Sequence, residues 1–361
     1  MTKVVILLGA GATLADVATK PRKQRPPLDK RFFSDASLTT QKWRVEHVRT
    51  YMKQTYDRDV MVSAHDSLEG VMGQIYTDLF NPLLEASALD AFRQLIKLFN
   101  TRLAATTNDI RATNKRLLYR IIASYLSHGV KPSDLTIVTF NQDIQVEKTL
   151  DLMSTVDRWR SIAEEIFNFP GLYSLGPSAP EVTFPARAPE ESLFPQKRSS
   201  SGCIKLLKLH GSLNWYSTHS SATPTRAAMF KANRKIRITS RRTIDPNMTL
   251  TGKQRKMFTL PVIVPPVSHK SAVIHQDMAP LWRQAEEALK EADELIIFGY
   301  SCPPLDFESS NQLRRSQLNR TVSAAISLID PEPAIAARYI SLLDARCLRY
   351  YASAADFIKN G

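Results

Sequence analysis

The apolar positions of the chain fall into short continuous runs and into helical spacings. The first run, Val4 to Leu8, contains β-branched residues and ends at Gly9. A run of this kind is typical of a strand that is covered on both faces of a parallel sheet. Further strand-like runs occupy residues 135–139, 204–209, 260–264, 295–298, 325–329 and 348–351.

Apolar residues three and four positions apart predict helices between these runs. The predicted helices cover residues 40–55, 67–83, 89–106, 114–128, 278–292, 307–318 and 333–344. In the last third of the chain strands and helices alternate, which indicates βαβ units and a parallel sheet. The sequence therefore predicts an α/β fold with a Rossmann-like, doubly wound parallel sheet.

We expect residues 1–361 to form one such domain with two insertions. Residues 38–130 are helical and stand between the first two strands of the sheet, so they form a helical insertion or subdomain. Residues 217–257 are polar and strongly basic. Their pattern fits either a β-hairpin or a mobile loop. The proline-rich segments 20–30 and 170–202 are predicted to be loops.

Composition narrows the class of protein. Hydrophobic residues make up 43% and charged residues 23% of the 361 positions, as in an ordinary globular protein. No apolar run is long enough for a membrane-spanning helix, and the three cysteines are scattered, which predicts a reduced, cytoplasmic protein with no membrane partner. The net charge of +13 can attract nucleic acid, an acidic partner or an anionic cofactor.

A glycine-containing turn follows the first strand. In Gly9-Ala10-Gly11-Ala12-Thr13 the glycines allow a tight turn and a close approach to a pyrophosphate. The third glycine of the dinucleotide-binding fingerprint is absent. A strand–helix turn with no ligand would show the same pattern.

Polar residues follow two further strands. Asn141 and Asp143 come after 135–139, and His210 comes after 204–209. Ligands bind at this edge of an open α/β sheet, and a histidine can accept a proton from a ribose hydroxyl. The alternatives are that Asn141 and Asp143 cap a helix and that His210 is structural. Gly299, Ser301 and Asp330 end two later strands, and an acid at such a position can accept a hydrogen bond from a ribose hydroxyl.

Together and in this order, the motifs resemble the sirtuin family, and more closely its bacterial NAD-hydrolase branch. The segments that carry the resemblance are, in chain order, GAGAT, PPLDKRFF, TFNQD, KLHGSLNW, FGYSCPP and LIDPEP. The resemblance implies a Rossmann-like domain that holds NAD⁺ across the strand ends. It implies phosphate contacts from Gly9, Ala10, Gly11 and Thr13, and adenosine contacts from Gly299, Ser301 and Asp330.

The resemblance also implies catalytic roles. Asn141 would orient the nicotinamide ribose or the attacking water, Asp143 would hold the carboxamide, and His210 would be the general base. The products would be nicotinamide and ADP-ribose. Deacylases of the family hold zinc with four paired cysteines, and this chain has no C-x-x-C pair, so we expect no zinc and no deacylation.

The family branch further implies a regulated effector that depletes NAD⁺ in bacterial anti-phage defence (abortive infection). Such an effector is expected to be a homo-oligomer with a partner ATPase or nucleic-acid sensor as activator. Two alternatives stay open. One is an ADP-ribosyl transferase or cyclase that uses the same site. The other is a catalytically silent NAD-binding subunit that docks nucleic acid or an acidic partner through the basic insertion.

Overall fold

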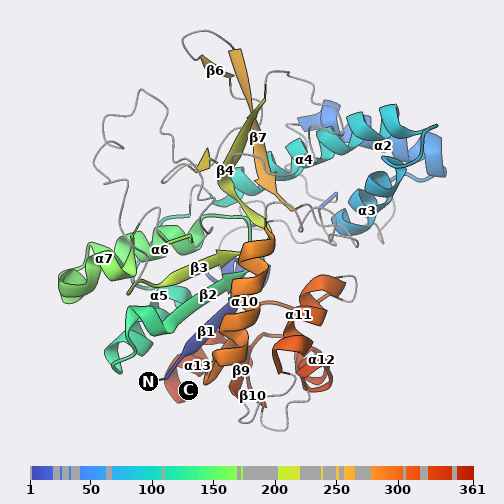
Figure 1. The fold of residues 1–361 in the computed structure, drawn as a ribbon. Helices are drawn as coiled ribbons and strands as arrows, with labels where there is room; N and C mark the ends of the chain where they lie inside the picture. The colour runs from blue at the N-terminus through green and yellow to red at the C-terminus, as the bar shows by residue number, and fades with distance from the viewer. Residues whose placement is uncertain are drawn as a thin grey trace.

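Six parallel strands form the central sheet, in the order β10-β9-β8-β1-β2-β3. They are β1 (Val4–Leu8), β2 (Leu135–Thr139), β3 (Lys205–Lys208), β8 (Glu294–Phe298), β9 (Ala325–Ile329) and β10 (Leu348–Tyr351). Counted within this sheet, the order is 3-2-1-4-5-6, the strand order of the Rossmann fold. The predicted doubly wound α/β class is therefore confirmed (Figure 1).

The computed structural model describes most of the chain. The described residues are 2–18, 25–26, 32–33, 41–61, 67–107, 110–168, 172–173, 202–219, 237–238, 249–251, 256–264, 278–303, 306–317, 324–343 and 348–361. Most of the two predicted loops, 20–30 and 170–202, lies outside these residues. So does most of the basic runs 231–242 and 252–255.

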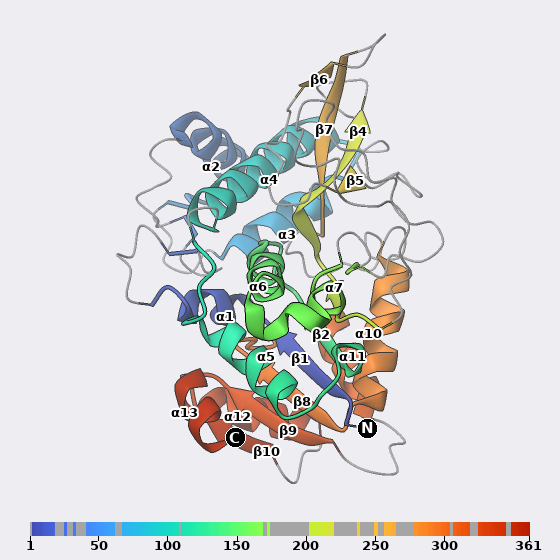
Figure 2. The ribbon, with the colours of Figure 1, turned by 90° about the vertical axis from the view of Figure 1, so that its left-hand side faces the viewer.

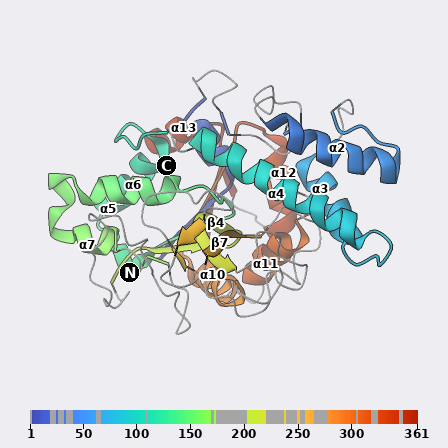
Figure 3. The same cartoon turned by 90° about the horizontal axis from the view of Figure 1, so that it is seen from above.

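The central strands are apolar on both faces because helices cover both sides. Every residue of β1 and of β2 is buried. One layer contains α5 (Leu117–Ser127), α6 (Gln145–Ser154) and α13 (Ala354–Asn360), and the other contains α10 (Ala279–Glu291), α11 (Phe307–Gln317) and α12 (Ala334–Leu343). Figure 2 looks onto the first layer, and Figure 3 shows α10 and α11 on the opposite side of the strands from α5 and α13. Between β2 and β3 lie α7 (Ala163–Ile166) and the 3₁₀ helix Asp157–Ile162, and a second 3₁₀ helix, Pro132–Asp134, precedes β2.

Three helices form a separate group between β1 and β2. They are α2 (Lys42–Tyr56), α3 (Leu68–Asp78) and α4 (Glu85–Thr107), and both α2 and α3 pack against α4. The hydroxyls of Tyr51 and Tyr56 both donate to the Asp78 carboxylate, at 2.7 and 2.6 Å. The helical periodicity predicted these three helices within a few residues of their ends. Helix α5, whose segment the same periodicity predicted, packs against α6 and α13 over the sheet.

A second, antiparallel sheet has the order β5-β4-β7-β6. Its strands are β4 (Gly211–His219), β5 (Arg237–Ile238), β6 (Thr249–Thr251) and β7 (Lys256–Ile263). Where it is described, the basic insertion therefore takes the β-structured alternative. The run 260–264 was assigned to the parallel sheet from sequence, and that assignment is wrong. Within that run, residues up to Ile263 belong to β7, which pairs antiparallel with β4, and β4 itself was not predicted.

Candidate functional site

The predicted site residues lie at the carboxyl ends of five parallel strands. Gly9 follows β1, Asn141 follows β2, His210 follows β3, Gly299 follows β8 and Asp330 follows β9. All five strands belong to one sheet, so these residues share one edge of it. The strand order reverses between β1 and β8, and ligands of open α/β sheets bind in the crevice at such a switch point.

Glycines bring two strand-end loops into contact at the switch point. The Gly9 N–H donates to the Phe298 carbonyl at 3.1 Å, and the Gly11 N–H donates to the Gly299 carbonyl at 2.9 Å. A Cβ on Gly11 would lie 2.8 Å from the Gly299 Cα, and a Cβ on Gly299 would lie 2.2 Å from the Ala12 nitrogen. Both glycines are thus required by this contact, and the N–H groups of Gly9 and Gly11 are bonded within the protein.

Beside this contact, Asn141 and Asp143 are bonded to the glycine turn. The Asn141 amide Nδ2 donates to the Gly9 carbonyl at 2.9 Å and to the Thr13 hydroxyl at 3.3 Å. The Thr13 hydroxyl in turn donates to Asp143 Oδ2 at 2.9 Å. The other oxygen, Asp143 Oδ1, accepts the N–H of Gln145, the first residue of α6, at 2.9 Å, whereas the N-cap residue of α6 is Ile144. Asp143 therefore bonds both the glycine turn and the first turn of α6 without being the N-cap residue.

A second group of polar side chains, which sequence reasoning missed, joins the start of α5 to α6 and to the end of the glycine-turn helix. The Arg116 guanidinium donates to the side chain of Gln145 at 2.7 Å. Asp16, at the end of the glycine-turn helix α1 (Ala10–Ala15), accepts the Leu117 N–H at 2.9 Å. Burial raises the pKa of Asp16 and lowers the pKa of Arg116. Nothing in their spacing marked these residues, because the two contacts join positions that are 29 and 101 residues apart.

His210 lies in a buried aromatic cluster with 7% of its surface exposed. Its ring centroid is 5.1 Å from that of Phe140 and 6.2 Å from that of Trp282. Trp282 Nε1 donates to the Leu209 carbonyl at 3.0 Å, and the His210 carbonyl accepts the Val264 N–H at 2.9 Å. The main-chain carbonyls of His210 and of the residue before it are therefore both hydrogen-bonded to neighbouring segments. Trp282 was predicted only as part of an amphipathic helix.

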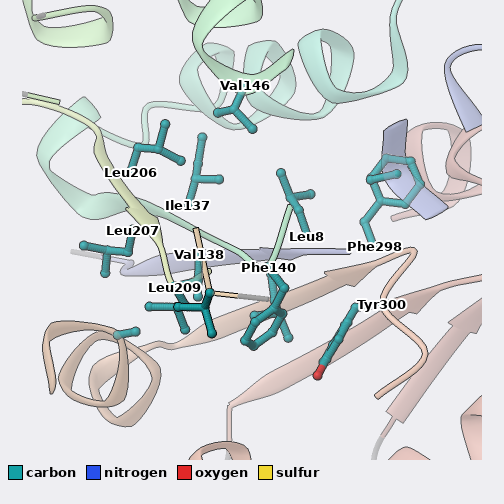
Figure 4. Packing of buried hydrophobic residues seen from close by; sticks show 14 of the residues in the cluster. Leu8, Ile137, Val138, Phe140, Val146, Leu206, Leu207, Leu209, Phe298 and Tyr300 are labelled. Atoms are coloured by element: carbon teal, nitrogen blue, oxygen red, sulfur yellow. The ribbon is translucent and has the colours of Figure 1, made fainter. Parts of the chain in front are cut away.

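Phe140 extends this cluster to the β8 side of the switch point. Its ring stacks on that of Tyr300, with centroids 4.3 Å apart. Figure 4 shows the two side chains next to each other. The Tyr300 hydroxyl donates to Asp306 Oδ2 at 2.8 Å, and burial raises the pKa of Tyr300 well above its usual value. The Tyr300 carbonyl accepts the Tyr339 hydroxyl at 2.7 Å. These contacts fix the loop that follows Gly299.

The remaining predicted residues, Ser301 and Asp330, flank that loop. The Ser301 side chain is exposed, and its carbonyl accepts the Arg338 guanidinium at 2.6 Å. Asp330 Oδ1 accepts the Glu332 N–H at 2.9 Å, and burial raises the pKa of Asp330. Both residues therefore lie at the predicted edge, but neither bonds directly to Asn141, Asp143 or His210 in the described contacts.

No family model matches this chain, and no curated protein matches it. Solved structures of Sir2 proteins are similar to it at a low level. A mutant Sir2 homologue with ADP-ribose has 13% identity and a TM-score of 0.43, over 98% of this chain and 88% of that one. Sir2Tm with a propionylated peptide has 12% identity and a TM-score of 0.42, over 99% and 90%. Sir2 with a p53 peptide and NAD⁺ has 11% identity and a TM-score of 0.41, over 99% and 90%.

Likenesses this weak carry no inference about function, so we base the function on the chain's own contacts. Among the described residues, no group of three or more His, Cys, Asp or Glu side chains could hold a metal ion. No helix in the described part of the chain is long and apolar enough to cross a bilayer.

Proposed function

We propose that this protein binds NAD⁺ at the carboxyl edge of the parallel sheet and hydrolyses the bond between nicotinamide and ribose. One observation carries the proposal. Thr13, Asn141 and Asp143 come from two strand ends, are bonded to one another beside the switch point, and lie next to the aromatic cluster that holds His210. Switch points of Rossmann sheets are the usual sites of dinucleotides.

In this proposal, the C1′–N bond breaks as nicotinamide leaves, and a water oxygen forms the new bond to C1′. Asn141 orients the nicotinamide ribose or this water, Asp143 holds the carboxamide, and His210 accepts the proton. The transition state in which nicotinamide leaves resembles an oxocarbenium ion. The site must therefore hold the ribose and exclude bulk water. A positioned general base contributes about 10²–10⁴-fold to the rate of such a step.

The proposal places the other half of NAD⁺ at the residues that the motif resemblance implies, and their positions at the same sheet edge support it. Because the N–H groups of Gly9 and Gly11 are already bonded, the glycines serve to bring the turn close to the phosphates. Ala10 is the exposed residue of the turn and contacts them directly. Ser301 and Asp330 are assigned to the adenosine half because they flank the switch point on its β8 side.

The biological role that we propose is depletion of NAD⁺ as a regulated effector in anti-phage defence, and it rests on the motif resemblance alone. An enzyme that drains NAD⁺ needs restraint, so the proposal includes control by self-association or by a partner ATPase or nucleic-acid sensor. Turnover that is independent of protein concentration and of any partner would contradict this control.

The test is to incubate the purified protein with NAD⁺ and to separate the products by chromatography. We expect nicotinamide and ADP-ribose from the wild type and none from the double variant Asn141→Ala, His210→Ala. His128→Ala is the matched control, because His128 is exposed at the end of α5. A cyclic or protein-linked product would show that the reaction is transfer of ADP-ribose and not hydrolysis. NAD⁺ binding that the double variant retains, with no turnover by any form, would favour a silent binding subunit.

A further inference from the structure

A fully buried lysine connects the two halves of the proposed catalytic site. Lys208, the last residue of β3, has 0% of its surface exposed. Its ammonium group donates to the Asp143 main-chain carbonyl and to Glu147 Oε1, the latter at 2.9 Å. Lys208 thus bonds the β2–α6 loop that carries Asn141 and Asp143, and it stands two residues before His210.

Glu147 extends these contacts into a buried polar network. It lies in the first turn of α6, is 3% exposed, and accepts the Tyr173 hydroxyl at 2.7 Å. The Asn214 side chain donates to the same hydroxyl at 3.1 Å. We call Lys208, Glu147, Tyr173 and Asn214 the Lys208 network. Its members come from β3, α6, β4 and the described residues 172–173, and Lys208 joins it to the loop that holds Asp143.

Stability alone does not account for a buried lysine–glutamate pair. Removing two charges from water is expensive, and apolar side chains of similar volume usually stabilise a protein as well or better. Glu147 Oε2 makes no hydrogen bond within the described residues, so the pair does not even satisfy all of its own polar atoms. What an apolar pair could not supply is the hydrogen bond from Lys208 to the Asp143 carbonyl.

We propose that Lys208 is a positioning residue, which holds the Asp143 loop in register with His210. The inference rests on the proposed function, because it assigns to Lys208 a role in the same site. Lys208 does not touch the substrate. Its effect is to fix the distance between the Asn141–Asp143 segment and the segment that carries His210, and a displacement of about 1 Å in such a site can lower the rate by about 10²-fold.

The test compares two variants. Lys208→Met leaves Glu147 buried without its counter-charge, so it should lower both Tm and kcat. The apolar variant Lys208→Met, Glu147→Leu, Tyr173→Phe removes the charged pair and the hydroxyl together. We expect its Tm to lie above that of Lys208→Met, because no charge is left buried alone, while its kcat for NAD⁺ stays about 10²-fold low, with little change in KM. Recovery of kcat together with Tm would show that Lys208 is only structural.

Two controls keep the result interpretable. The surface pair Lys290–Glu286 lies at 2.8 Å on α10, and the variant Lys290→Met, Glu286→Leu should change kcat little. If the apolar variant does not fold, Lys208→Met is assayed below its unfolding temperature, with folding confirmed by near-ultraviolet circular dichroism. A normal kcat in that folded sample would overturn the proposal.

Hydrogen exchange separates this inference from the proposed function. If the wild type neither binds nor cleaves NAD⁺, the proposed function fails on its own. Lys208 would still be expected to hold residues 141–145, so their main-chain amides should exchange about 10-fold faster in the apolar variant than in the wild type. Unchanged exchange at these amides would show that Lys208 does not position the loop.

Discussion

The two sides of the switch point are held together by different kinds of contact. Beyond β2, side chains bond to one another: Asn141 to Thr13, and Thr13 to Asp143. Beyond β8, three successive main-chain carbonyls hold the loop to α1 and α12: the Gly299 carbonyl accepts the Gly11 N–H, and the next two accept the hydroxyl of Tyr339 and the guanidinium of Arg338.

From this difference we expect the two sides of the switch point to have different roles. On the β2 side, the polar side chains are fixed before a ligand arrives, which is what a reacting centre needs. On the β8 side, the backbone sets the shape, and side chains such as Ser301 are exposed. Substitutions should therefore change the folding of the β8 side through its backbone and the chemistry of the β2 side through its side chains.

The largest expected effect is on folding, at Gly299. Its φ of +63° is in the left-handed region, and a Cβ there would lie 2.2 Å from the Ala12 nitrogen. Gly299→Ala therefore combines backbone strain with a clash against main-chain atoms that cannot move aside. We expect the free energy of unfolding to fall by at least about 3 kcal/mol, measured by chemical denaturation.

Gly129→Ala separates the two causes. Gly129 has a φ of +87°, and a Cβ there would meet no atom within 4 Å. This control should lose only the cost of a left-handed alanine, about 1–2 kcal/mol. Equal losses at Gly299 and Gly129 would mean that the contact between the two loops contributes nothing.

The second prediction contrasts one acid from each side. In Asp143→Asn and Asp330→Asn, an amide oxygen can still accept the N–H of Gln145 or Glu332, so both variants should fold. Asp143→Asn disturbs the bond with Thr13 at the reacting centre, and we expect kcat for NAD⁺ hydrolysis to fall by about 10²-fold.

Asp330→Asn should act on binding instead. In the proposed assignment Asp330 bonds the ribose of adenosine, so the loss of that charged hydrogen bond should raise KM by about 2- to 10-fold and leave kcat nearly unchanged. Steady-state kinetics of the two purified variants measures both constants. If Asp330→Asn lowered kcat and Asp143→Asn changed only KM, the assignment of the two sides would be reversed.

The sequence predicted the parallel strands and the edge of the site because both depend on local patterns. Strands covered on both faces are continuous apolar runs, and residues after such runs lie at one edge. The run 260–264 was misassigned because a buried antiparallel strand can show the same composition. Its partner β4 is set by pairing across the basic insertion, which no local pattern records.

The supporting residues could not be predicted, because their roles depend on contacts between distant segments. Lys208 belongs to a predicted motif, but its bond to the Asp143 carbonyl spans 65 positions. The requirement for Gly11 comes from Gly299, which the sequence places nearly three hundred positions away. From the sequence, the same glycine was assigned to a tight turn and to phosphate binding, with a turn that binds no ligand as the alternative.

The smallest expected effect concerns the pH dependence of stability at Asp16, whose side chain accepts the Leu117 N–H at the start of α5. Burial is the largest cause that raises the pKa of this carboxyl, and the charge of Asp143 adds to it, while the Leu117 N–H and Arg116 oppose it. A carboxyl whose pKa is higher in the folded protein than in the unfolded chain favours folding at low pH, and that contribution is lost as pH rises through the folded pKa.

Asp16→Asn keeps an oxygen for the Leu117 N–H and removes the charge. The variant should therefore be more stable than the wild type at neutral pH, and the difference should shrink as pH falls through the folded pKa towards that of the unfolded chain. Tm measured by calorimetry at several pH values tests this. The opposite result would be a Tm of Asp16→Asn that is below the wild-type Tm at neutral pH and approaches it as pH falls. It would mean that Arg116 stabilises the charged form of Asp16 as an ion pair.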